Sequence, residues 1–202
     1  MVSSPGHRPP SLRTILAVEL GLGVLAVGLA LLFGLAPWDD FDLSGSALVI
    51  GAVATLPMAL SLLLLDRVEW SWLNELESLV ERVLVPWFRD MPAWGLMLVA
   101  LSAGVGEELL FRGVAQAGLE TIVGGPIALL AASLLFGLAH ALNRAYFIIA
   151  TLAGAYLGLL YLLTDNLLVP ILVHFLYDWF ALRYYLRRFP RHRSDASDRL
   201  DA

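Results

Sequence analysis

The chain has 202 residues, of which 59% are hydrophobic and only 15% are charged, and its mean hydropathy is +0.76. This composition is too apolar for a soluble domain and indicates a polytopic membrane protein. The sequence contains no cysteine and no lysine, which excludes disulfides, cysteine nucleophiles, Cys-ligated metals and lysine bases. The net charge of -5, with no basic patch before the C-terminal tail, argues against a nucleic-acid partner.

The apolar segments predict an all-α membrane helix bundle of about six transmembrane helices. We expect a single membrane domain over residues 1–202, with flexible tails at 1–12 and 188–202. The predicted spans are 14–36, 45–65, 93–119, 126–142, 145–163 and 167–186. Residues 66–89 differ, because apolar residues recur there at helical spacing between charged ones. That segment predicts one interfacial amphipathic helix on the membrane surface.

The arginines indicate the orientation of the chain. They lie before the first predicted span, between spans two and three, between four and five, and at or after the end of span six. The other connections carry only acidic charges: Asp39, Asp40, Asp42, Glu120 and Asp165. The positive-inside rule then places both termini in the cytoplasm. We predict an integral protein of the cytoplasmic (inner) membrane of a prokaryote.

Ionisable side chains within the apolar segments are the candidate functional residues, because charges at that depth are costly and usually serve a function. They are Glu19, Glu107, Glu108, Arg112, His140, His174 and Asp178. Glu108 and Arg112 are four residues apart and can pair on one helical face. Glu107 is rotated about 100° around the helix from Glu108, so its side chain can face a different part of the bundle. His174 and Asp178 also share a face.

The candidates come from three predicted helices and can converge in the bundle. A carboxylate that takes a proton from water, an imidazole beside it and further donors for an oxyanion would hydrolyse an amide or ester. The same residues can instead ligate a divalent metal such as zinc that activates the water. The candidate ligands are Glu107, His140, His174 and Asp178, and the sequence leaves the cofactor open.

Two further features have simpler interpretations. Glu19 is expected to make an unrelated interhelical hydrogen bond or to lie near the surface. The motif Gly154-x-x-x-Gly158 is expected to mark close packing between helices.

Three motifs together resemble a known family. Glu107-Glu108-x-x-x-Arg112, Phe136-x-x-x-His140 and His174-x-x-x-Asp178 follow one another in hydrophobic segments. They resemble the motifs of the CPBP intramembrane proteases, also called CAAX prenyl protease type II or ABI-like proteases. The resemblance covers about residues 93–182, and we take 93–186 as the catalytic core of this type.

The resemblance implies an intramembrane endopeptidase with a cavity open to the cytoplasm. It implies that Glu107 and His140 activate the hydrolytic water, that His174 and Asp178 help to stabilise the oxyanion, and that Glu108 and Arg112 support the site. Asp178 stands where the family often has Asn, and an ionised Asp cannot donate to an oxyanion. Asp178 can instead be protonated, orient His174 or ligate a metal, and the sequence leaves these three roles open.

The expected partners are the lipid bilayer and a membrane-associated or CAAX-like peptide or protein substrate, reached from the cytoplasmic side. Two other functions stay open. The first is a non-proteolytic membrane interaction or bacteriocin-immunity protein, since ABI-like members are linked to self-immunity. The second is a proton-coupled transporter that uses the same carboxylates and imidazoles as a relay. Such transporters usually show internal repeats, which this sequence lacks.

Overall fold

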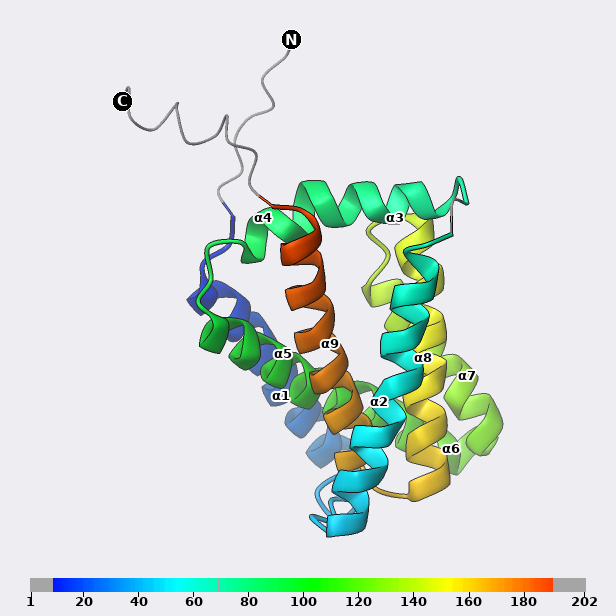
Figure 1. Cartoon of the computed structure of the whole chain (residues 1–202). Coiled ribbons are helices and arrows are strands. Elements are labelled where there is room, and N and C mark those ends of the chain that lie inside the picture. The colour runs from blue at the N-terminus through cyan, green and yellow to red at the C-terminus, as the bar shows by residue number, and fades with distance from the viewer. Residues whose placement is uncertain (1–8, 69, 191–202) are drawn as a thin grey trace.

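The computed structural model describes residues 9–68 and 70–190, and its regular structure in these ranges is entirely helical (Figure 1). The elements are α1 (Leu12–Phe33), α2 (Gly45–Leu65), α3 (Leu73–Leu79), η1 (Val80–Leu84), α4 (Val85–Phe88), α5 (Ala93–Glu108), η2 (Leu109–Gln116), α6 (Ala117–Val123), α7 (Gly125–Ala139), α8 (Arg144–Thr164) and α9 (Leu168–Arg188). The predicted all-α bundle is confirmed. Most of the predicted tails lies outside the described residues, but α1 already begins at Leu12 and α9 continues to Arg188.

All six segments predicted as spans form helices. Four are long and apolar enough to cross a membrane: α1, α2, α8 and the uninterrupted run Ala93–Val123. Helix α7 has 15 residues, and a helix needs about 20 residues to cross the hydrocarbon core of a bilayer. Helix α9 has 21 residues but includes Asp178 and three arginines, so it is less apolar. Large apolar side chains on α1 and α2 point outward, as expected for surfaces that face lipid.

A helical run of residues 73–88, here called the roof helix, lies across one end of the bundle (Figure 1). It comprises α3, the π-helical η1 and α4. The prediction placed one helix over 66–89, whereas the described residues between Asp66 and Trp72 form turns or irregular backbone. The chain needs these residues to change direction between α2 and the roof helix.

Contacts at and just before the start of the roof helix bind it to the bundle. Arg188 near the end of α9 pairs with Asp66 and with Glu77, each at 3.0 Å. Asn143 Nδ2, just before α8, donates to the backbone oxygen of Glu75 at 2.9 Å. The roof helix is therefore attached to α8 and α9, the two helices that flank it below.

Helix α9 passes through the middle of the bundle between α5 and α2 (Figure 1). A Cβ on Gly104 of α5 would lie 3.1 Å from Ile171 O and from Phe175 N of α9. At the crossing of α1 with α5, a Cβ on Gly106 would lie 2.6 Å from Glu19 O. The approach at Gly106 requires glycine, and at Gly104 a Cβ would force the backbone of α9 to shift slightly. These close crossings bring the polar side chains of α1, α5 and α9 together.

The opposite end of the bundle is closed by two loops that bind each other. The loop before α2 contributes Asp40, whose backbone oxygen accepts from Leu167 N and whose carboxylate accepts from Tyr161. Asn166 exchanges hydrogen bonds with the backbone of Asp42. These contacts join α1 and α2 to α8 and α9 at the end away from the roof helix.

Candidate active site

The two adjacent glutamates lie where α5 continues into η2. Helix η2 is π-helical, within one helical run that extends from Ala93 to Val123. A π-helical turn contains more residues than an α-helical turn and is frequent at functional sites. Glu108, Arg112 and Gln116 recur along this run, and each is at most 1% exposed. A regular α-helix is what the sequence predicts here, and no feature of the sequence indicates the π-helical stretch.

Glu108 and Arg112 form the predicted ion pair, with Arg112 Nη1 2.8 Å from Glu108 Oε1. Arg112 Nη2 donates to Gly154 O at 2.8 Å, and Gln116 Nε2 donates to Gly158 O at 2.9 Å. A Cβ on Gly158 would lie 2.6 Å from Gln116 Oε1. The close packing predicted for these two glycines is confirmed, and their carbonyls also bind the buried polar side chains of η2.

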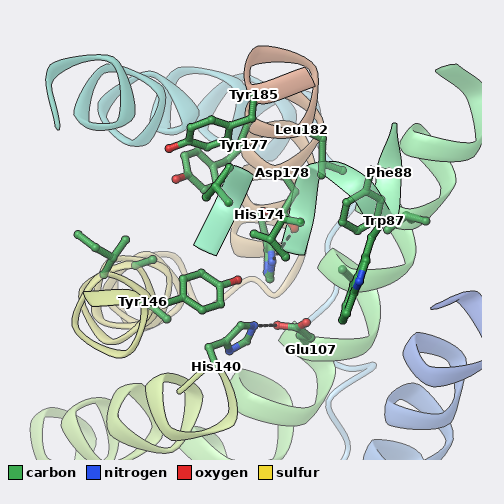
Figure 2. A pocket seen from close by; sticks show the side chains of 18 of the residues that line it. Trp87, Phe88, Glu107, His140, Tyr146, His174, Tyr177, Asp178, Leu182 and Tyr185 are labelled. Atoms are coloured by element: carbon green, nitrogen blue, oxygen red, sulfur yellow. Dashed lines mark ion pairs between the residues drawn. The ribbon is translucent and has the colours of Figure 1, made fainter. Parts of the chain in front are cut away.

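His140 is the residue that ends α7. Its Nδ1 is 2.8 Å from Phe136 O, and its ring stacks on the Phe136 ring with 4.4 Å between centroids. These two contacts orient the ring so that Nε2 faces Glu107 Oε2 at 3.5 Å (Figure 2). The predicted span continued to residue 142, but the helix ends at Ala139. This early end allows His140 to turn toward Glu107.

His174 lies between two carboxylates. Its Nδ1 is 2.7 Å from Glu108 Oε1. Its Nε2 is 3.4 Å from Asp178 Oδ2 on the same helix (Figure 2). The proximity of His174 to Asp178 follows from their spacing in the sequence. The bond to Glu108 was not predicted, and it connects Arg112, Glu108 and His174 in one buried chain of polar contacts.

A cavity of about 330 Å³ opens beside these groups, beneath the roof helix (Figure 2). Glu107, His140, His174 and Asp178 all lie in its wall. Most of the remaining wall is apolar, and the roof helix contributes Leu76, Val80, Leu84, Val85, Trp87 and Phe88. The volume is in the range of ligand pockets, about 300–1,000 Å³. The site therefore combines a few convergent polar groups with an apolar chamber.

Comparison with known families agrees with this arrangement. Residues 89–180 match the family described as "Type II CAAX prenyl endopeptidase Rce1-like". Over this segment, slightly less than half of the chain, the protein is similar to the CAAX protease (CPBP) family. A search of curated proteins and a search of solved structures each gave no match. The family is one of intramembrane endopeptidases, and the apolar helices of the bundle fit an integral membrane protein of this class.

Glu19 lies in the cavity wall, although it is outside the matched segment. Its Oε2 is buried and has no hydrogen-bond partner among the described residues. The expectation that Glu19 is unrelated to the site is wrong. Helix α1 crosses α5 at Gly106, directly before Glu107, and this crossing brings Glu19 to the cavity. The sequence showed a carboxylate in the first span but not which face of that helix meets α5.

Tyr146 is a second cavity residue that the sequence analysis did not select. Its ring stands edge-on to His140 with 5.8 Å between centroids, and its hydroxyl points toward His174 (Figure 2). Asn143 caps α8 by accepting from Tyr146 N at 2.7 Å, which holds the first turn of the helix in place. Tyr146 could have been suspected only from its position shortly after the His140 motif.

The candidate metal ligands do not form a ligand cluster among the described residues. Within residues 9–68 and 70–190, no group of three or more His, Cys, Asp or Glu side chains is placed to hold one ion. His140 Nδ1 is already bonded to Phe136 O, and His174 Nδ1 to Glu108. The side chains in this arrangement do not fit a bound divalent metal.

Proposed function

We propose that this protein is a CAAX-type protease that hydrolyses peptide bonds with a water molecule activated by Glu107 and His140. The observation that carries the proposal is the 3.5 Å separation of Glu107 Oε2 and His140 Nε2 at the cavity. This distance is long for a hydrogen bond, and Glu107 Oε2 accepts none from the described residues. A water molecule beside both atoms would satisfy them.

The hydrogen bonds of His140 support its role as a proton acceptor. A carbonyl oxygen can only accept, so the bond to Phe136 O assigns the proton to Nδ1 and leaves the Nε2 lone pair facing the cavity. Glu107 and His140 are then two acceptors for the two O–H bonds of one water molecule. As the water oxygen attacks the carbonyl carbon, one of them takes its proton, and that proton later passes to the leaving amine.

His174 is proposed to stabilise the oxyanion. Its Nδ1–H donates to Glu108, because a carboxylate can only accept. When His174 is protonated its Nε2–H is a second donor, and Asp178 at 3.4 Å stabilises the imidazolium charge. The oxyanion would take hydrogen bonds from His174 Nε2–H and from the hydroxyl of Tyr146. An ionised Asp178 then acts on His174 rather than on the substrate.

The proposed substrate is a membrane-associated or CAAX-like peptide segment that enters from the cytoplasmic side beneath the roof helix. The first and last described residues lie at the end of the bundle that carries the roof helix (Figure 1). The connections at that end contain arginine, whereas Asp40 and Asp42 lie in the opposite loops. The positive-inside rule would place the roof helix, and both termini, on the cytoplasmic side.

The decisive experiment measures cleavage of a fluorescence-quenched reporter peptide by the full chain in lipid nanodiscs. Glu107→Gln and His140→Ala should each lower kcat/KM by about 10²–10⁴-fold, the usual contribution of a general base. Glu120→Gln changes an exposed carboxylate on α6 and should leave the rate unchanged. The proposal would be refuted if Glu107→Gln has full activity and the same free energy of unfolding as the wild type.

A further inference from the structure

Glu19 is a cavity carboxylate that the proposed hydrolysis does not use. It lies about two turns into α1, which begins at Leu12, and Ile15 one turn earlier lines the same cavity. The close crossing at Gly106 fixes the backbone of Glu19 against α5, the helix that carries Glu107. The position of Glu19 beside the reacting groups is therefore determined by backbone packing.

The carboxylate of Glu19 has no partner like those of Glu108 Oε1. Glu108 accepts from Arg112 and His174. Glu19 Oε2 is buried, and no described residue donates to it. Glu107, only 8% exposed, likewise has an Oε2 without a hydrogen bond that is aimed into the cavity (Figure 2). A buried oxygen without a donor is costly, so a donor brought by a bound molecule would be favourable.

The charges of the cavity wall do not balance. Three carboxylates and two imidazoles line the cavity: Glu19, Glu107, Asp178, His140 and His174. Glu107 faces His140 at 3.5 Å and Asp178 faces His174 at 3.4 Å, whereas no described cationic side chain pairs with Glu19. No arginine is among the described wall residues, and the chain has no lysine. Of the three carboxylates, Glu19 is the one that no described His or Arg side chain faces at ion-pair distance.

We propose that Glu19 binds the ammonium or guanidinium group of a basic residue in the peptide substrate. The inference rests on the proposed protease function, because it assumes a peptide in this cavity. The methylene stem of a lysine or arginine would lie along the apolar wall while its charged head reaches Glu19. Glu19 is thus a specificity residue, which positions one substrate side chain while Glu107 and His140 act on the peptide bond.

The test uses the full chain in nanodiscs and fluorescence-quenched peptides of one apolar sequence, with Arg, Gln or Glu placed at each position in turn. At one position, kcat/KM for the Arg peptide should be roughly tenfold to a hundredfold higher than for the Gln peptide. This is the ratio expected from one hydrogen bond between charged groups. Glu19→Gln should abolish this preference, so that the Arg and Gln peptides are cleaved at similar rates. Glu19→Arg should invert it in favour of the Glu peptide.

Glu81→Gln is the matched control, since Glu81 is an exposed carboxylate of the roof helix outside the cavity wall. It should keep the wild-type preference. The proposal is overturned if Glu19→Gln slows the Arg, Gln and Glu peptides equally, because Glu19 would then act on folding or on the chemistry. It is also overturned if the preference for Arg survives this substitution.

Peptide binding to the His140→Ala variant separates this proposal from the protease proposal, because that variant keeps all three cavity carboxylates. Fluorescence anisotropy with labelled Arg and Gln peptides should show selective binding of the Arg peptide, which the added Glu19→Gln substitution removes. That result supports the role of Glu19 even if the wild type cleaves no peptide, an outcome that would refute only the hydrolysis. Equal binding of both peptides overturns the role of Glu19, whether or not cleavage occurs.

Discussion

Truncation of Glu108 tests how far the bundle depends on one buried carboxylate. Glu108 is 0% exposed, and its Oε1 accepts from Arg112 Nη1 at 2.8 Å and from His174 Nδ1 at 2.7 Å. Arg112 is 1% exposed, so Glu108→Ala would leave its buried guanidinium without its ion-pair partner, with the hydrogen bond to Gly154 O and the face of the Phe136 ring. We therefore expect a large loss of stability from this single substitution.

Two estimates of the loss agree. Hydrogen bonds to a charged group contribute about 1.5–3 kcal/mol each, and Glu108→Ala removes two of them. Independently, removing one partner of a buried ion pair costs about 3–5 kcal/mol. The expected loss in free energy of unfolding for Glu108→Ala is therefore about 3–5 kcal/mol. The double variant Glu108→Leu with Arg112→Met removes both charges and should be more stable than Glu108→Ala.

Reversible unfolding of the full chain in mixed detergent micelles, followed by tryptophan fluorescence, measures these differences. Glu120→Ala, at an exposed position on α6, serves as the control. If the free energy of unfolding of Glu108→Ala is within about 1 kcal/mol of the wild-type value, the Glu108–Arg112 pair contributes no more than an exposed ion pair. That result would refute the expected cost of leaving a buried charge unpaired. A double variant no more stable than Glu108→Ala would contradict the explanation by an unpaired buried charge.

Two further predictions concern the helix crossing and the cofactor. Gly106→Ala should lower the free energy of unfolding by about 1–3 kcal/mol and reduce cleavage, because its Cβ would lie 2.6 Å from the backbone oxygen of Glu19. Gly28→Ala, whose Cβ would meet nothing within 4 Å, is the matched control on α1 and should not destabilise the protein. Dialysis against a chelator should leave the cleavage rate unchanged, because the described residues offer no cluster of three ligands. Activity lost to the chelator and restored by Zn²⁺ would contradict that expectation.

The sequence was sufficient to predict features that depend only on residues close to one another along one helix. Each long apolar segment became a helix, because a chain in lipid must satisfy its backbone hydrogen bonds internally. The pair of Glu108 and Arg112 and the proximity of His174 to Asp178 followed from spacings of four residues, which helical geometry turns into contacts. The three motifs also led to the family that the matched segment supports.

The contacts between helices were decided only by the tertiary structure. His174 meets Glu108 across 66 positions of sequence, and Glu19 reaches the cavity from a helix outside the family match. Lipid and protein interior are both apolar, so the hydrophobic pattern of a spanning helix does not indicate which face turns inward. The close backbone crossings at glycines such as Gly104 and Gly106 determine which face of each helix turns inward. The sequence therefore determined the class of the protein and its candidate groups, whereas helix packing determined which of those groups share one cavity.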